Sequence, residues 1–282
     1  MSAAVLAAAP LALAHSPEKL EGQAGACAQY LGNEAVVISA GETKILFDAF
    51  YTNSYGQYAL VPDQLQQALL AGTPPFDGVD AVFVSHIHGD HFTVEPTLDY
   101  LRAHPDVVLY ASKQVVDVIV QTSADKSIAD RLVAFDLQAG DPAQTAELKG
   151  ISIDVVRIPH AGGAGRANIE NLAFRVSLDE AITVMHMGDA DPDDRHFAPH
   201  QDHWDSKTLD VAMPPYWFFG SPAGRSIIEG RLKPTHAIGV HVPIAAADDA
   251  AGWKARANAD LFTTPGEMRE FGESRCTTKT ED

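Results

Sequence analysis

Basic side chains are scarce in this 282-residue sequence. It has 20 Lys and Arg against 38 Asp and Glu, which gives a formal net charge of −18. A protein that binds nucleic acid or an anionic membrane needs clustered Lys and Arg to contact phosphate groups. The composition therefore argues against nucleic acids and membranes as partners.

Cysteine is scarce as well, with Cys27 and Cys276 the two in the chain. No Cys-x-x-Cys pair is present, so a thiolate zinc site and a thioredoxin-type redox motif have no support. The two cysteines can pair if the protein is exported, whereas in the cytosol they are expected to be two free thiols. The sequence leaves both alternatives open.

A long hydrophobic run is missing too. Residues 1–14 form an apolar Ala/Leu run that is too short to span a bilayer. The run ends in Ala12-Leu13-Ala14, which has the small-x-small form of a signal-peptidase site, although no basic residue precedes Lys19. Residues 1–14 are therefore either the remnant of a signal peptide, which we favour and which implies a periplasmic or secreted protein, or a disordered tail of a cytoplasmic one.

The remaining composition is typical of a packed globular protein, with 46% hydrophobic and 21% charged residues. Short apolar runs and helical patterns both occur, which predicts an α/β fold. No linker interrupts residues 25–270, so we expect residues 15–282 to form a single domain. The predicted strands are 35–39, 44–47, 79–85, 107–111, 151–158, 172–177, 181–185, 209–213 and 236–240, and the predicted helices are 63–71, 96–103, 113–121 and 226–231.

The strongest feature follows the apolar strand predicted at residues 79–85. It is His86-Ile87-His88-Gly89-Asp90-His91, with four candidate metal ligands within six residues. Alternate residues of an extended backbone project to one side, so His86, His88 and Asp90 can converge without a special fold. Gly89 allows a tight turn, after which His91 can point to a neighbouring position. Imidazole and carboxylate together suit zinc, and also iron or manganese.

Three later residues lie where predicted strands end, and catalytic metals take several protein ligands. His160 follows strand 151–158, Asp189 follows strand 181–185, and His241 ends strand 236–240. Loops at strand ends often carry functional side chains. We therefore expect these three residues to join the ligand set.

Two of these residues have competitors nearby. Asp191, Asp193 and Asp194 follow Asp189 and are interpreted as surface charges. His236 begins the strand that ends at His241, and we prefer His241 because the other ligands lie at the carboxyl ends of strands.

Together these motifs resemble the metallo-β-lactamase fold superfamily. The resemblance covers roughly Gln29 to Pro243, with the motifs in the family's order: a strand-ending Asp48, the His-x-His-x-Asp-His hexapeptide, His160, Gly188-Asp189 and His241. Residues 171–175 and 232–238 look most like the ascorbate-6-phosphate-lactonase-like branch. The resemblance implies a four-layer αβ/βα sandwich with a two-metal site at the edge of the sheets.

The resemblance also implies a role for each residue. His86, His88 and His160 would hold the first metal, Asp90, His91 and His241 would hold the second, and Asp189 would bridge them. Asp90 is in addition assigned to the catalytic machinery, and Asp48 is expected to orient the loop without binding a metal. The implied cofactors are two zinc ions, with manganese or iron as alternatives, and a hydroxide between them as the nucleophile.

Four aromatic residues are candidate walls of a substrate pocket. Tyr51 and Tyr55 follow Asp48, and Tyr216 and Trp217 lie in a loop bounded by Pro and Gly. Each is explained equally well as an ordinary core residue.

We therefore expect a metal-dependent hydrolase that cleaves an ester, lactone or phosphodiester bond of a small molecule. Four alternatives stay open: a β-lactamase, an iron-dependent persulfide oxygenase of the same fold, a nuclease of the same fold, which would need a basic track for its substrate, and a metal-binding protein without catalysis. Specificity lies in the loops, so the sequence identifies neither the substrate nor the oligomeric state.

Overall fold

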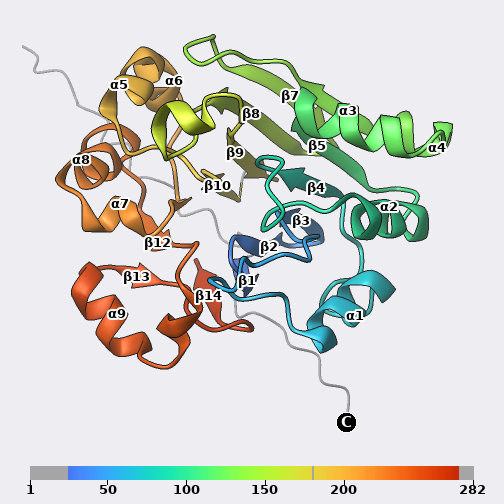
Figure 1. Ribbon diagram of the computed structural model, residues 1–282, viewed down its shortest axis with the longest axis horizontal. Coiled ribbons are helices and arrows are strands. Elements are labelled where there is room, and N and C mark those ends of the chain that lie inside the picture. The colour runs from blue at the N-terminus through green and yellow to red at the C-terminus, as the bar shows by residue number, and fades with distance from the viewer. Residues whose placement is uncertain (1–24, 180, 273–282) are drawn as a thin grey trace, which may run out of the picture.

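The computed structural model describes residues 25–179 and 181–272. Two mixed sheets of seven strands each dominate it (Figure 1). The first has the order β14 (Met268–Phe271), β1 (Ala26–Gly32), β2 (Ala35–Ala40), β3 (Thr43–Phe47), β4 (Ala81–Val84), β5 (Val108–Ser112), β6 (Leu132–Phe135). The second has the order β13 (Asp260–Leu261), β12 (His236–Gly239), β11 (Val211–Met213), β10 (Ile182–His186), β9 (Leu172–Leu178), β8 (Ile151–Arg157), β7 (Gln144–Leu148).

Both sheets combine antiparallel and parallel pairing in the same way. In the first sheet β14, β1, β2 and β3 pair antiparallel, and β3, β4, β5 and β6 pair parallel. In the second sheet β7 to β10 pair antiparallel, and β10 to β13 pair parallel. Neighbouring parallel strands end at the same edge of a sheet, so the loops that follow them lie side by side.

Helices cover the outer face of each sheet. In Figure 1, α1 (Asp63–Ala71), α2 (Val94–Ala103), α3 (Lys113–Thr122) and α4 (Lys126–Ala129) lie on the right, against the first sheet. On the left lie α5 (Asp194–Phe197), α6 (Gln201–Asp205), α7 (Trp217–Gly220), α8 (Pro222–Ser226) and α9 (Ala250–Ala257). Apolar side chains of α5, α6, α7, α9 and η3 (Ile227–Leu232) pack against the second sheet. Three short 3₁₀ turns, η1 (Gly163–Arg166), η2 (Ala198–His200) and η4 (Ile244–Ala247), complete the elements. No helix of the described residues is long and apolar enough to cross a membrane.

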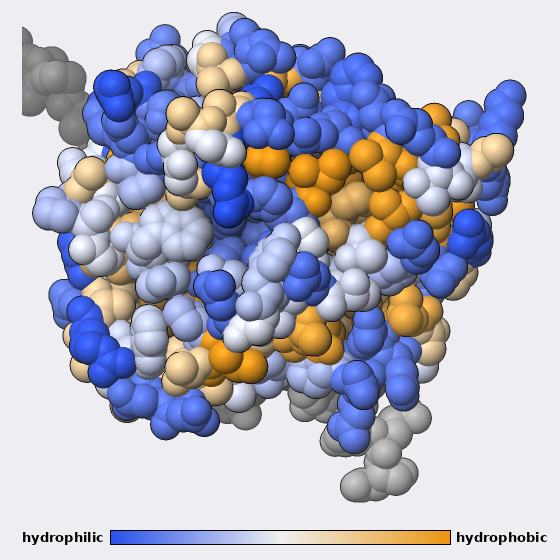
Figure 2. All heavy atoms as spheres, in the orientation of Figure 1, coloured by the Kyte–Doolittle hydropathy of each residue, from blue (hydrophilic) through white to orange (hydrophobic). Residues whose placement is uncertain are grey.

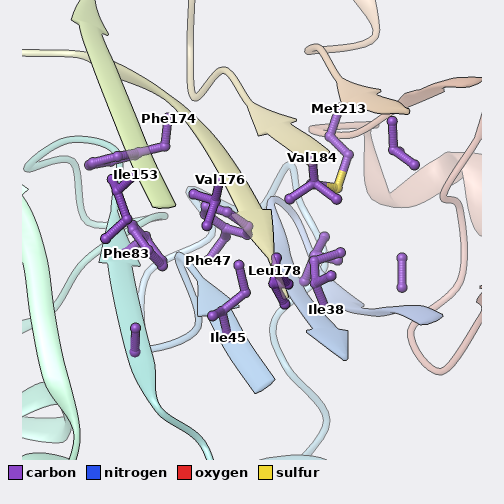
Figure 3. Packing of buried hydrophobic residues seen from close by; sticks show 14 of the residues in the cluster. Ile38, Ile45, Phe47, Phe83, Ile153, Phe174, Val176, Leu178, Val184 and Met213 are labelled. Carbon is purple, nitrogen blue, oxygen red and sulfur yellow. The ribbon is translucent and has the colours of Figure 1, made fainter. Parts of the chain in front are cut away.

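The main core lies between the two sheets. Figure 3 shows Phe47 and Phe83 of the first sheet facing Phe174 and Val176 of the second, and all four side chains are buried. Each such side chain contributes roughly 1.5–3 kcal/mol by leaving water. Two further apolar clusters join each sheet to its own helices. The layers are therefore helix, sheet, sheet and helix, and the predicted αβ/βα sandwich is confirmed.

Local sequence signals account for many of the element boundaries. Ser112 caps the helix that follows it, because its side chain accepts a hydrogen bond from Val115 N at the start of α3. Gly72 ends α1 in the left-handed conformation. The helix predicted at residues 226–231 is present as a π-helix, η3.

Five strands have no counterpart among the predictions, namely β1, β6, β7, β13 and β14. Strand β7 is largely exposed and polar, and β13 has two residues, so neither carries a strong apolar pattern. Residues 1–24 and 273–282 lie outside the described residues, and with them the segment 1–14 and Cys276. The pairing of Cys27 with Cys276 and the role of residues 1–14 stay predictions.

Candidate metal centre

The predicted ligands lie in four loops at one edge of the sandwich. His86 to His91 follow β4, His160 follows β8, Asp189 follows β10 and His241 follows β12. Ser85 O accepts a hydrogen bond from Leu172 N of β9, which joins the two sheets directly below these loops. The structure therefore brings all seven predicted ligands together, in the groups that the resemblance implied.

The hexapeptide does not continue as an extended strand. His91 N and Phe92 N both donate hydrogen bonds to His88 O, which folds residues 88–92 into a turn. The expectation that His86, His88 and Asp90 project to one side is therefore wrong. The turn sends His86 and His88 into one cluster and Asp90 and His91 into another.

The first cluster consists of three imidazoles and one carboxylate. His88 Nδ1 lies 3.0 Å from His86 Nε2 and 3.0 Å from His160 Nε2. Asp189 Oδ2 lies 3.0 Å from His160 Nε2 and 3.8 Å from His86 Nε2. The four donor atoms thus surround one position.

The second cluster uses the other oxygen of the same aspartate. Asp189 Oδ1 lies 2.9 Å from His241 Nε2 and 3.4 Å from His91 Nε2. Asp90 Oδ2 lies 3.5 Å from His241 Nε2 and 3.7 Å from His91 Nε2. Asp189 therefore lies between the clusters with one oxygen directed to each.

These distances fit bound metal ions. Ligand atoms that surround zinc tetrahedrally at about 2.0–2.1 Å lie roughly 3.3 Å from one another. The buried atoms His91 Nε2, Asp189 Oδ1 and His241 Nε2 have no hydrogen-bond partner. Buried polar atoms are rarely left unsatisfied, so their convergence indicates that a cation belongs between them.

The two clusters differ in how the protein sets the charge of their histidines before metal arrives. In the first, burial lowers the pKa of His86 well below its usual value and lowers the pKa of His88 to about 4. In the second, burial opposes protonation, but the carboxylate of Asp189 raises the pKa of His91 well above its usual value and that of His241 to about 9. His86 and His88 are thus neutral at pH 7 and ready to bind a metal, whereas His91 and His241 must first lose protons.

The aspartates of the centre stay ionised although they are largely buried. Burial raises the pKa of Asp189, but His241, His91 and His160 outweigh this effect and hold it well below its usual range. For Asp90, the nearby imidazoles of His241 and His91 lower the pKa and outweigh burial in the same way.

A cavity of about 610 Å³ opens above the two clusters. Figure 2 shows the hydrophilic hollow near the centre of the exposed face. Its lining residues are Tyr55, Gln57, Tyr58, His88, Asp90, His160, Ala161, Gly162, Arg166, Asp189, Trp217 and His241. The rings of Tyr58 and Trp217 meet the His241 ring edge-on, with centroids 4.0 and 5.2 Å away.

Two of the four aromatic residues expected in the pocket, Tyr55 and Trp217, line this cavity. Tyr51 does not, because its ring is buried in the core under α2 and its hydroxyl donates to Ala59 O. Tyr216 does not line the cavity either, and its ring packs against the rings of Trp217 and Trp253.

Comparison with known proteins identifies the family. The sequence matches the model of the beta-lactamase superfamily domain over residues 43–245. The chain belongs to this superfamily. The family match supports the predicted class of enzyme, a metallo-hydrolase. A comparison with curated proteins gives no significant match.

Several solved structures share the fold at low sequence identity. Igni18, a metallo hydrolase from Ignicoccus hospitalis, is 17% identical with a TM-score of 0.58, and the match covers 89% of this chain and 100% of that one. A possible metal-dependent hydrolase from Veillonella parvula is 14% identical with a TM-score of 0.58, with 88% and 99% covered. CmlA, a diiron β-hydroxylase from Streptomyces venezuelae, is 13% identical with a TM-score of 0.51, with 89% and 54% covered.

Asp48 holds a ligand of the superfamily site in place. Its carboxylate accepts hydrogen bonds from Ser85 N and Ser85 Oγ, and its Oδ2 lies 2.8 Å from His91 Nδ1. Because this contact uses the nitrogen that faces away from the metal cluster, Asp48 orients His91 and leaves its Nε2 free to bind. The position agrees with the role expected for Asp48.

Three residues that support the site were not predicted from the sequence. Asn33 Nδ2 donates to Asp90 O, and Asn33 O accepts from His241 N, so one residue holds two ligand loops. Asn171 Oδ1 accepts from Asp189 N, while its Nδ2 donates to Ile158 O and Met187 O. No short motif signals these residues, because each acts through backbone groups that only the fold brings near.

The third missed residue is Glu34, which is completely buried below the centre. Its Oε2 lies 3.4 Å from His186 Nε2 and 4.0 Å from His91 Nδ1, yet neither carboxylate oxygen makes a hydrogen bond. Burial raises the pKa of Glu34 well above its usual value, and the positive charges of His91 and His241 oppose the shift. His186 itself packs against Phe47 and donates to Glu34 O, as expected for a structural histidine.

Proposed function

We propose that this protein is a hydrolase that uses two metal ions, with zinc the first candidate, to cleave an ester, lactone or phosphodiester bond of a small molecule. The observation that carries the proposal is the division of the Asp189 carboxylate, whose two oxygens belong to two separate clusters of ligand atoms. A carboxylate shared in this way can hold two metal ions side by side, as two-metal catalysis requires.

The donor set favours zinc. Five imidazole nitrogens and two carboxylates supply the ligands, and neutral imidazole suits zinc well. When bound, such ions lower the pKa of a water molecule and polarise a carbonyl or phosphoryl oxygen. This chemistry needs no nucleophilic Ser or Cys from the chain.

The protein's own residues position and shield the reaction. Asp189 fixes the separation of the two positions, and Asp48 and Asn33 hold the loops of His91 and Asp90. Tyr58 and Trp217 form apolar walls beside His241, which exclude water from one side of the substrate. Burial, assisted by Asp189 and Asp90, raises the pKa of Tyr58 to about 12, so its hydroxyl stays a proton donor to a substrate oxygen.

Metal content and hydrolysis measured together test the proposal. We expect about two equivalents of zinc in the loaded wild type and hydrolysis of at least one ester, lactone or phosphodiester. His160→Ala should lose the metal of the first cluster and lower kcat by roughly 100-fold or more. His236→Ala is the matched control, because His236 is exposed and its ring lies beside Phe271, away from the two clusters. Less than one equivalent in the wild type, or unchanged hydrolysis in His160→Ala, would contradict the proposal.

The same measurement of metal content and hydrolysis distinguishes the proposed zinc hydrolase from an iron enzyme. The diiron neighbour shows that this fold is compatible with iron in another protein. Iron that co-purifies with the chain, together with oxygen consumption and no hydrolysis by the zinc form, would favour an oxygenase.

A further inference from the structure

Arg166 is an arginine whose charge the protein leaves without a partner. Every other arginine of residues 25–179 and 181–272 donates a hydrogen bond to a carboxylate or to a backbone carbonyl. Arg166 contacts only the imidazole of His88, with Nη1 3.2 Å from each ring nitrogen. Arg131, Arg157 and Arg225 lack a carboxylate partner too, but each of them holds a backbone carbonyl, which Arg166 does not.

The local backbone places this side chain over the metal centre. Arg166 ends η1, which begins three residues after the ligand His160. Gly162 has φ +106°, and a Cβ added there would lie 3.1 Å from Arg166 Cγ. The absence of a side chain at Gly162 therefore gives the arginine stem room to fold back across the turn toward His88.

Arg166 is the one Lys or Arg among the residues that line the cavity. Its guanidinium is not used to hold any backbone group, so it contributes little to the stability of the loop. The acidic lining residues Asp90 and Asp189 are both committed to the metal clusters. An unpaired guanidinium in such a cavity presents several donors to whatever enters, and its planar fork matches the oxygens of a carboxylate or a phosphate.

We propose that Arg166 binds an anionic group of the substrate, and that the enzyme therefore acts on small esters or lactones that carry a carboxylate or phosphate near the scissile bond. The inference rests on the proposed hydrolase function and narrows its substrate class. The aromatic wall formed by Tyr55, Tyr58 and Trp217 then contacts the uncharged part of the substrate.

Matched esters test this inference. Phenyl acetate and 4-acetoxybenzoate differ by one carboxylate, and 4-acetoxyphenyl phosphate carries a phosphate in the same place. We expect the zinc-loaded wild type to prefer an anionic ester in kcat/KM by about 10- to 100-fold, the value of one charged hydrogen-bonded contact. Arg166→Ala should abolish this preference mainly through KM, and Arg166→Lys should keep part of it. The anionic ester with the larger kcat/KM relative to phenyl acetate shows whether a carboxylate or a phosphate is bound.

Arg102→Ala is the control, because Arg102 is an exposed arginine paired with Asp99 on α2. It should leave the preference unchanged. Equal preference in the wild type and Arg166→Ala would overturn the inference while leaving the hydrolase proposal intact. If no ester is cleaved, the proposed function fails for esters, and calorimetry with 4-hydroxybenzoate decides the inference. At least tenfold weaker binding to Arg166→Ala would support it, and equal binding would overturn it.

Discussion

Asp48 Oδ2 lies 2.8 Å from Nδ1 of the buried His91 ring and accepts a hydrogen bond from it. The contact fixes the ring so that Nε2 points at the second cluster. We expect Asp48→Asn to lower the metal affinity of that cluster by about 10- to 100-fold, because the amide keeps one acceptor where Asp48 uses two. Titration of the metal-free protein with zinc against a competing chelator measures the change.

Asp210→Asn is the matched control for this substitution. Asp210 Oδ2 also accepts a backbone hydrogen bond, from Thr183 N, but it lies at the opposite ends of the strands. Its substitution should cost stability without changing metal affinity. Equal losses of affinity in both variants would show that Asp48 acts on the fold as a whole and does not specifically orient His91.

Metal binding should depend on pH differently at the two clusters. Without metal, His241 has a pKa of about 9 and His91 a pKa well above its usual value, so both carry protons at pH 7. His88, with a pKa of about 4, does not. Metal binding must displace the protons, so the affinity of the second cluster should rise up to tenfold per pH unit for each proton as the pH approaches 9.

Zinc titrations at pH 6 and pH 8 in two buffers of different ionisation enthalpy check this expectation. We expect the first equivalent to bind with similar affinity at both values and the second to bind much more tightly at pH 8, with proton release. In His241→Ala, the second step should release fewer protons. Identical affinities at both pH values would contradict the assignment of the protonated histidines to the second cluster.

The candidate metal ligands could be predicted from the sequence because His and Asp at strand ends form a pattern that is visible along the chain. His160 and Asp189 are far apart in the chain, yet each follows an apolar strand, and strands of one sheet end together. Arg166 and Tyr58 gave no such signal, because the direction of a side chain in a loop depends on turns such as that of Gly162. Tyr51 is the opposite case: the sequence pattern placed it in the pocket, but its ring is packed in the apolar core.

Glu34 should destabilise the metal-free protein. Burial raises its folded pKa well above the ordinary value of 4.5, so its stabilising contribution is complete below that value and is lost as the pH rises through the folded pKa. We expect Glu34→Gln to raise the free energy of unfolding of the chelator-treated protein at pH 8 by about 1–3 kcal/mol, the cost of a buried unpaired group. At pH 5 the difference should be smaller.

Urea unfolding between pH 5 and pH 8 measures this difference. Glu147→Gln serves as the control, because Glu147 is exposed on β7 and its substitution removes the same charge from the surface. With metal bound, the cations should offset the charge of Glu34, so Glu34→Gln should raise the free energy of unfolding by less. A metal-free Glu34→Gln that is less stable than the wild type at pH 8 would show that Glu34 has a partner in solution.

Gly188 controls the position of the shared ligand Asp189. It has φ +52°, and a Cβ added there would lie 2.4 Å from Asn171 Oδ1 and 2.7 Å from Ser85 Cβ. Asn171 accepts the hydrogen bond of Asp189 N, so a displaced Asn171 also displaces the bridging carboxylate. Gly188→Ala should therefore lower the free energy of unfolding by roughly 2–4 kcal/mol and reduce metal binding at both clusters.

Gly140→Ala separates the cost of backbone strain at a positive φ from the cost of the clash with Asn171 and Ser85. Gly140 also has a positive φ, +90°, but a Cβ there would meet nothing within 4 Å. Its substitution should cost only the backbone strain, about 1 kcal/mol, and leave zinc stoichiometry at the wild-type value. Urea unfolding and metal analysis of the two variants measure both effects. If Gly188→Ala loses no more stability than Gly140→Ala and still binds zinc fully, Asn171 moves aside without moving Asp189. Gly188 would then be required only for its backbone conformation.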